Sequence, residues 1–112
     1  PTDFEDQIIS LLSTDTEVIP NKFIIKQNFP NPFNPMTTIS FEIPYESVVS
    51  LTIYDIQGKV VRKLVHRSRL VGSHNMVWEA TNDKGLAVSA GMYFYRLEFD
   101  DVVKTMKMLL VK

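Results

Sequence analysis

The stretch Thr38-Ile39-Ser40-Phe41-Glu42-Ile43 alternates polar and apolar side chains without interruption. A strand directs successive side chains to opposite faces, so this period of two predicts a strand with one buried face and one face in water. The stretch Val49-Ser50-Leu51-Thr52-Ile53-Tyr54 repeats the pattern after a short break. The two stretches therefore predict two neighbouring strands that pair antiparallel.

The same alternation continues to the C-terminal end of the sequence. His74, Met76 and Trp78 share one predicted face, and Trp78, Tyr93, Tyr95 and Leu97 are expected in the core. The predicted strands cover residues 23–28, 38–44, 48–55, 59–66, 73–80, 91–99 and 102–111. About seven strands without an intervening helix predict an all-β fold, an antiparallel immunoglobulin-like β-sandwich, with a closed barrel as the alternative.

Turn chemistry separates the predicted strands. In Asp55-Ile56-Gln57-Gly58, aspartate can bond its own backbone and glycine can adopt positive φ, which predicts a tight hairpin closed by a glycine bulge. Asn82-Asp83-Lys84-Gly85 follows the same logic, and Gly91 is a further predicted turn residue. Asp100-Asp101 leaves room for a two-residue hairpin before the last strand.

Composition narrows the class of protein. The chain has 112 residues, of which 45% are apolar and 22% charged, as in ordinary globular domains. A net charge of -1 gives no reason to expect nucleic acid as a partner. The absence of cysteine excludes disulfides, cysteine nucleophiles and thiolate metal sites. No apolar run is long enough to span a membrane, and no signal peptide is visible.

Residues 1–21 differ from the remainder in charge. They hold five acidic residues and no Lys or Arg, a net of -5, so residues 22–112 carry +4. Residues 2–12 have capping-box spacing and a helical apolar period, which predicts a short helix followed by a polar connector over 13–21. We expect residues 1–21 to be a helical or irregular leader, either a linker or the tail of a preceding domain, and residues 22–112 to be the sandwich.

The most distinctive segment is Gln27-Asn28-Phe29-Pro30-Asn31-Pro32-Phe33-Asn34-Pro35. Proline cannot donate to a strand ladder and restricts the residue before it to extended geometry. Three prolines in six residues therefore predict a stiff crossover rather than the centre of a strand. We expect Phe29 and Phe33 to plug the end of the sandwich, and the asparagines to bond local backbone. A recognition surface on the same rigid segment is compatible with this role.

Catalysis finds little support. His74 alternates with buried positions and is expected to be a half-buried structural residue, while His66 lies in a basic rim. No third group is placed to orient either ring, so no nucleophilic arrangement can be argued. The oxygen-rich turns at residues 82–83 and 100–101 could bind calcium, but their turn chemistry already explains them. We expect no catalytic, cofactor-binding or metal-binding residues.

Two further functional hypotheses concern the aromatic residues and the last strand. Trp78, Tyr93 and Tyr95 would suit a sugar-stacking platform in a carbohydrate-binding module, but their inward positions favour core packing. Lysines at 104, 107 and 112 are expected on an edge or solvent face, a common defence against edge aggregation. Recognition of this strand by edge pairing is the functional alternative.

One combination of motifs points to a family. It comprises the proline segment, Thr37-Thr38-Ile39, Tyr54-Asp55 with Gly58 and Val60, Gly72, His74, Trp78, Asp83, Gly85, Ser89, Gly91, Tyr93-Phe94-Tyr95-Arg96-Leu97 and Lys107-Met108-Leu109-Leu110-Val111-Lys112. This series resembles the type A C-terminal sorting domain of the bacterial type IX secretion system. The resemblance covers nearly everything after Pro20, although Ala80-Thr81-Asn82-Asp83 stands where that family usually has Asp-Gly. The flagellar hook-cap immunoglobulin-like domain is similar over much of the same pattern.

The resemblance implies a non-catalytic export signal at the end of a secreted protein. Such domains are recognised by an outer-membrane translocon and its shuttle protein, and a sortase-like peptidase often cuts the preceding linker, here within residues 13–21. The implied partners are this machinery and an N-terminal cargo domain in the same chain. The implied location is secreted, at the cell surface or outer membrane of a Gram-negative bacterium. The expected recognition residues are Phe29, Pro30, Asn31, Pro32, Phe33, Asn34, Pro35, Lys107, Met108, Leu109, Leu110, Val111 and Lys112. A structural or adhesive immunoglobulin-like domain, such as a hook-cap scaffold, and a carbohydrate-binding module remain the alternatives.

Overall fold

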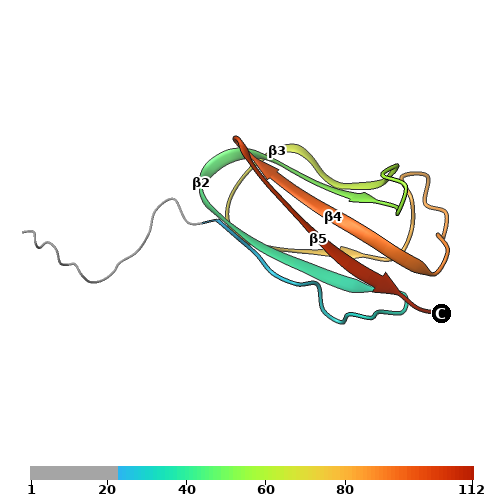
Figure 1. Cartoon of the computed structure of the whole chain (residues 1–112). Helices are drawn as coiled ribbons and strands as arrows, with labels where there is room; N and C mark the ends of the chain where they lie inside the picture. Colours follow the sequence, from blue (N-terminus) through green and yellow to red (C-terminus); the bar gives the residue numbers. More distant parts are fainter. Residues whose placement is uncertain (1–22) are drawn as a thin grey trace, which may run out of the picture.

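A computed structural model describes residues 23–112, and every regular element in this range is a β-strand. The strands are β1 (Ile24–Ile25), β2 (Thr37–Tyr54), β3 (Val60–Trp78), β4 (Gly91–Phe99) and β5 (Val102–Leu110) (Figure 1). Without a helix in this part of the chain, none is available that could cross a membrane. The predicted helix at 2–12, the connector at 13–21 and their boundary with the sandwich lie outside the described residues.

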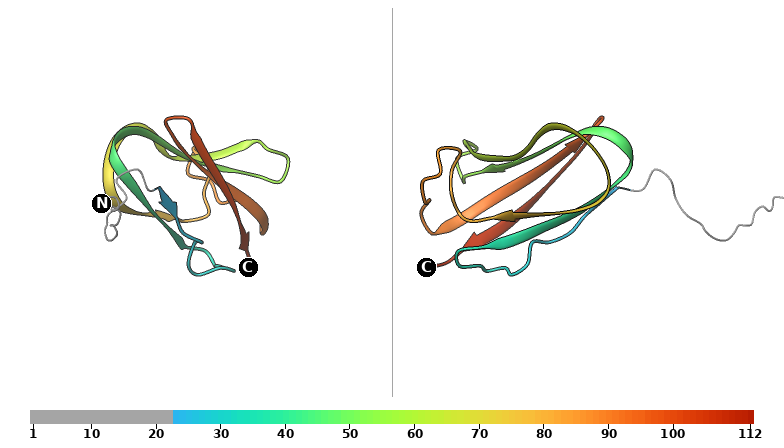
Figure 2. Two further views of the ribbon diagram at one scale, coloured as in Figure 1. Left: turned by 60° about the vertical axis from the view of Figure 1, so that its left-hand side comes forward. Right: turned by 180° about the vertical axis from the view of Figure 1, so that it is seen from behind.

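All strand pairs are antiparallel, and the sheet curls into two layers. β2 contributes to both layers, because residues 37–43 pair with β1 and with the end of β3, whereas residues 49–54 pair with the start of β3 and with β4. β5 pairs with β4 at the outside of the second layer. Figure 2 shows β2 and β3 curving together around one end of the molecule. The prediction of an all-β, immunoglobulin-like antiparallel sandwich is confirmed.

The strand boundaries differ from the prediction in the first half. Predicted strands 38–44 and 48–55 form one continuous strand, β2, and predicted strands 59–66 and 73–80 form its partner, β3. The ladder shifts register between Ile43 and Ser47 and again after Val49. Such bulges bend a strand without ending it, and a bulge can hold Pro44 because no ladder N–H is needed there. The seven predicted segments are therefore five strands, two of which bend from one layer into the other.

The core lies between the two layers and is built from the alternating positions. Trp78 is 1% exposed, and its ring meets Tyr93 edge-on at 5.3 Å and Phe33 at 5.7 Å. Leu97 and Tyr95 are fully buried beside them. The other large buried side chains are Ile39, Phe41, Ile43, Val49, Leu51, Ile53, Phe99, Met108 and Leu110. The inward faces of β2, β4 and β5 thus supply most of the buried apolar surface, which is the main source of stability in a domain of this size.

The turns have the bonding that their residue types favour. The Asp55 carboxylate accepts the amides of Gln57 and Lys59 at 2.9 and 3.0 Å, and the amide of Gly58 donates to the Asp55 carbonyl at 3.0 Å. Gly58 has φ of 86°, in the region where a side chain would be strained. The β4–β5 hairpin turns on two residues, with Asp100 at φ of 52°. These short turns fix the register of the strands that they join.

Candidate functional site

The proline segment runs beside β2 before it crosses to β5. Its first part is held by backbone hydrogen bonds, because Phe29 and Thr38 exchange both amide bonds at 3.0 and 2.9 Å. Directly paired residues of neighbouring strands place their side chains on the same face. Thr38 lies between the inward-facing Thr37 and Ile39, so it faces outward, and Phe29 faces outward with it.

The expectation that both phenylalanines plug the sandwich is therefore wrong for Phe29. Its side chain is 80% exposed, whereas Phe33 is 1% exposed and packs against Trp78. Met36, at the other end of the segment, is 50% exposed. The proline segment thus has one buried aromatic anchor and presents a second aromatic ring to solvent.

A buried polar network fixes the start of this segment. Asn28 is 2% exposed, and its side-chain amide donates to the Thr37 hydroxyl at 2.9 Å and to the Pro30 carbonyl at 3.2 Å. The backbone amide of Asn28 donates to the Tyr95 hydroxyl at 2.9 Å, and that hydroxyl donates to the Lys26 carbonyl at 2.8 Å. Buried polar groups need such partners, so the network replaces the ladder bonds that proline cannot make.

The segment is also tied directly to β5. The amide of Phe33 donates to the Leu109 carbonyl at 3.0 Å, and the amide of Val111 donates to the Phe33 carbonyl at 2.9 Å. The Asn31 side chain accepts the Leu109 amide at 3.0 Å, and the Gln27 side chain donates to the Lys107 carbonyl at 2.9 Å. The two segments predicted separately as recognition elements therefore lie side by side (Figure 1). We call residues 27–36 together with 107–112 the proline–β5 surface.

The proline–β5 surface contains both buried anchoring side chains and exposed side chains. Met108 and Leu110 point into the core at 1% exposure, as Phe33 does. The other predicted recognition residues are exposed or only partly covered: Pro30, Asn31, Pro32, Asn34 and Pro35 in the proline segment, and Lys107, Leu109, Val111 and Lys112 after it. A rigid row of prolines beside a basic strand is an arrangement suited to protein recognition, because little conformational entropy is lost on binding.

Sequence reasoning singled out the proline segment but missed two of the groups that hold it. Asn28, Thr37 and the hydroxyl of Tyr95 form the network. The expectation that asparagines bond local backbone is confirmed for Asn28, whose side chain donates to the Pro30 carbonyl, but Thr37 and the Tyr95 hydroxyl were given no positioning role. A signal was present, because a tyrosine at an inward-facing position must find a hydrogen-bond partner for its hydroxyl. The partner proved to be the backbone 67 residues earlier, which no local pattern reveals.

The Tyr95 network predicts how stability depends on pH. Burial raises the pKa of Tyr95 above its ordinary value of 10.0, against the opposing effect of its hydrogen bond to the Asn28 backbone. Above pH 10 the unfolded chain releases this proton before the folded chain does, so stability is expected to be constant below pH 10 and to fall above it. Thermal melting between about pH 8 and about pH 11 measures this slope.

A Tyr95→Phe variant is the control for this prediction. At neutral pH it should lose about 2 kcal/mol of stability, because the buried Asn28 amide and Lys26 carbonyl lose their partner. Above pH 10 it should lose less stability than the parent. The residual slope is due to Tyr93, whose pKa burial also raises, and to Tyr45, whose pKa is raised by its hydrogen bond to Asp100. Identical alkaline slopes in the two proteins would contradict the assignment to Tyr95.

The two histidines considered for catalysis, His66 and His74, lie in different environments. His66 is exposed, whereas His74 is half-buried and stacks on Phe41 at 5.6 Å. The Nε2 atom of His74 lies 2.9 Å from the Val71 carbonyl. His74 therefore has the setting of a structural histidine on the sheet.

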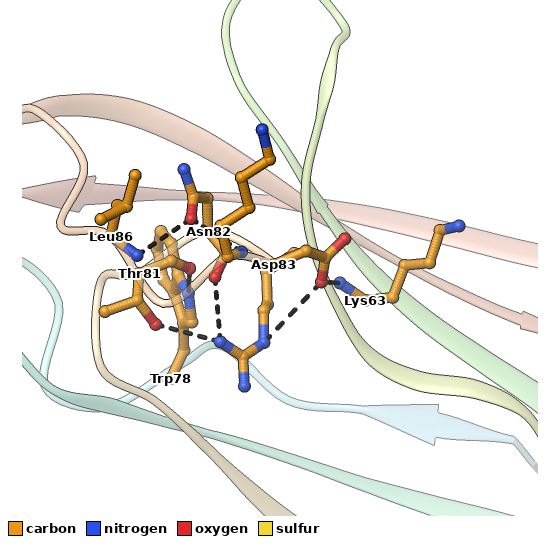
Figure 3. A network of polar contacts seen from close by, with 8 residues as sticks. Lys63, Trp78, Thr81, Asn82, Asp83 and Leu86 are labelled. Atoms are coloured by element: carbon orange, nitrogen blue, oxygen red, sulfur yellow. Dashed lines mark hydrogen bonds and ion pairs between the residues drawn. The ribbon is translucent and has the colours of Figure 1, made fainter.

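The turn at residues 82–85, weighed as a calcium site, has its oxygens engaged by the protein (Figure 3). The Asn82 side-chain oxygen accepts the amides of Lys84 and Leu86, and Asp83 accepts the amide of Lys63 at 2.9 Å. Gly85 closes the turn at φ of 81°, and Trp78 donates its indole N–H to the Thr81 carbonyl at 2.8 Å. No group of three or more His, Cys, Asp or Glu side chains that could hold a metal occurs in residues 23–112.

The residues weighed for sugar stacking lie in the core. Trp78 and Tyr95 are at most 1% exposed, and Tyr93 is 7% exposed with its hydroxyl donating to the Ser89 carbonyl. Tyr45 is 47% exposed but donates to Asp100, and Tyr54 lies under the guanidinium of Arg96. Core packing is thus the role of the three inward-facing rings.

Comparisons with known proteins give a family and a fold. Residues 34–101 match the FlgD Ig-like domain family. Among solved structures, the chain is similar to PorZ, described as an essential surface component of the type-IX secretion system of Porphyromonas gingivalis, with 18% identity over 80% of this chain and a TM-score of 0.55. It is also similar to dimeric latent PorU from the same organism, with 20% identity over 88% of this chain and a TM-score of 0.64.

The chain corresponds to a small part of each of these two larger proteins. The chain spans 11% of the PorZ structure and 10% of the PorU structure. No curated protein sequence gives a significant match. The family match starts after Phe33 and ends before β5, so most of the proline–β5 surface lies outside it.

Proposed function

Because the chain belongs to the FlgD Ig-like domain family, we propose that it acts as a non-catalytic recognition domain, and specifically as the export and surface-attachment signal of a type IX secretion cargo. The resemblance to type A sorting domains motivates the specific form of this proposal. The fold that the chain shares with PorZ supports a secretion-related setting.

The observation that carries the proposal is the joining of the two predicted recognition segments. Phe33, Asn31 and Gln27 bond to the backbone of β5, so the proline segment and the basic strand form one surface rather than two. A partner can then contact both segments in a single binding event. The proposed partners are the translocon and its shuttle protein, and the proposed location is the outer membrane or cell surface of the bacterium.

A reporter fusion tests the proposal. Residues 1–112 are appended to a periplasm-directed reporter in a host that has the secretion system, and the reporter is expected outside the cell. A reporter that stays in the periplasm while the appended chain remains intact and folded would exclude this function.

Phe29→Ala tests the surface itself. Phe29 is 80% exposed, so its loss should change the free energy of unfolding by less than about 0.5 kcal/mol. If the partner buries this ring, binding should weaken by about 2 kcal/mol, the size of an interface hot spot, and export should fall accordingly. Ile56→Ala, at another exposed apolar side chain in the Asp55 turn, is the matched control and should leave export unchanged. Equal export from the two variants would remove Phe29 from the recognition surface.

An immunoglobulin-like assembly scaffold that stays attached to its protein is the second candidate. The FlgD Ig-like family match favours it. Mass spectrometry of the mature cargo at the cell surface separates the two: an export signal that is cut off leaves no peptides from residues 23–112, whereas a retained scaffold does.

A further inference from the structure

One side of β5 is an edge of the sheet within residues 23–112, where its only ladder partner is β4. Alternate residues of an antiparallel strand direct their backbone groups to opposite sides of the strand. The Lys107 carbonyl and the Leu109 amide both bond to the proline segment and thereby identify the side that faces away from β4. Val103 and Thr105 are an even number of residues from Lys107 and Leu109, so their backbone N–H and C=O groups point to this same side.

The edge is covered over only part of its length. The proline segment occupies it from the Lys107 carbonyl onward, and farther along Phe33 forms a parallel bridge with Leu110. For Val103 and Thr105, residues 23–112 provide no hydrogen-bond partner on the outer side. We call residues 103–107 the open edge. The chain itself thus shows, next to the open edge, that β5 accepts a further strand-like segment.

Exposed apolar side chains and a hollow lie next to the open edge. Val103 is 55% exposed, and an open hollow of about 380 Å³ adjoins the strand. The residues that line it are Gln27, Phe94, Thr105, Met106 and Lys107. Phe94 pairs with Lys107 on the outer face of the sheet, so a long side chain from an added strand can lie over Thr105 and reach the ring. Unpaired backbone beside a side-chain pocket is the combination used in strand-addition binding.

The positive charge of the open edge favours some incoming strands over others. Lys104 and Lys107 are both exposed and, three residues apart, lie on opposite faces of β5. Lys104 is on the core side, where its ammonium group is 5.6 Å from the Phe23 ring centre. A second copy of the chain would bring like charges together, whereas carboxylates on an incoming strand would be attracted on both faces.

We propose that the open edge of β5 binds an extended acidic segment of a secretion component as an additional strand. Main-chain hydrogen bonds to Val103 and Thr105 align this segment, and two carboxylates three residues apart face Lys104 and Lys107. The identity of the partner rests on the proposed function, but the mode of binding rests on the edge alone.

A peptide titration tests the mode of binding. The probe is the fluorescein-labelled peptide Thr-Val-Glu-Val-Thr-Glu-Val-Thr, and its anisotropy is measured against the full 112-residue chain. The isomer Thr-Val-Glu-Thr-Glu-Val-Thr-Val has the same composition but places both carboxylates on one face. The first peptide is expected to bind about threefold more tightly than the second, a difference typical of one cross-strand charge pair. Equal affinities would overturn the assignment to the two lysines.

Thr105→Pro removes the outward amide without touching the β4–β5 ladder, and edge positions tolerate proline. It should weaken peptide binding about tenfold, while Thr105→Ser keeps the parent affinity. If melting shows that Thr105→Pro unfolds, the double variant Lys104→Glu, Lys107→Glu replaces it and should reverse the preference for the acidic peptide over its Lys counterpart. Parent-like binding by the folded proline variant or by the double variant overturns the proposal.

Amide hydrogen exchange adds an independent measurement. In the free chain the Thr105 amide should exchange fast and the Met106 amide slowly, and the peptide should slow the exchange of Thr105 alone. A Thr105 amide already protected in the free chain would mean that another part of the protein covers the edge, and the proposal fails. A reporter that is exported although the peptide does not bind contradicts only the edge binding. Peptide binding without export contradicts only the proposed function.

Discussion

Replacing Trp78 with alanine is expected to lower the free energy of unfolding by about 4 kcal/mol, the cost typical of deleting a large buried ring. Trp78 is 1% exposed and contacts Phe33 and Tyr93, so its removal leaves a cavity between the two layers. Since small domains are stable by only about 5–15 kcal/mol, a large part of the chain should be unfolded at moderate urea concentration. Urea titration followed by circular dichroism measures the change.

Two variants separate packing from hydrogen bonding at this position. Trp78→Phe keeps an aromatic ring but leaves the Thr81 carbonyl without the indole donor, and it should cost about 1–2 kcal/mol. Phe29→Ala, at an exposed ring, should change the midpoint hardly at all. Trp78→Ala would contradict the described core if its midpoint stayed close to that of Phe29→Ala.

Phe33→Ala is expected to cost about 3 kcal/mol and to detach the proline segment from β5. The Phe33 ring is the buried anchor of this segment, and its backbone bonds to Leu109 and Val111 depend on the position of that ring. Hydrogen exchange should therefore accelerate at the Val111 amide before it does so in the β2–β4 ladder. Uniform acceleration across all strands would mean that the segment has no separate attachment.

The Phe33→Ala and Trp78→Ala variants can be combined in a double-mutant cycle. Their ring centres are 5.7 Å apart, so each substitution removes part of the contact surface of the other residue. The double variant should lose about 1 kcal/mol less stability than the sum of the single variants, as is usual for residues in contact. Strict additivity would show that the two rings do not support each other.

Much of the fold was predictable because the alternation of apolar and polar residues along a strand indicates which side chains are buried. The inward positions of β4 follow the pattern without exception from Tyr93 to Phe99, and the turns at Asp55 and Asn82 contain the residues that their geometry requires. The continuity of β2 through Pro44 was not predictable in the same way. Proline usually ends a ladder, and only the bulge opposite Gly72 allows the strand to continue.

The candidate site was predictable in its parts but not in its assembly. The sequence shows a proline segment and a basic strand, about 78 residues apart, and only the fold brings Asn31 to the Leu109 amide. The error at Phe29 has a similar origin. Residues four apart in a straight extended segment would face the same side, but Phe29 follows the register of Thr38, whereas Phe33 follows that of Leu110.

The bridge between Phe33 and Leu110 is also expected to form late in folding. It closes a chain loop of nearly the whole described length, and contacts of such sequence separation form late and slowly. A nascent or truncated chain that lacks β5 can pair β2 with β3, but it has no Leu109 or Val111 to receive the proline segment. If a partner binds the proline–β5 surface as proposed, it can bind only chains in which β5 has been made and has paired with the proline segment.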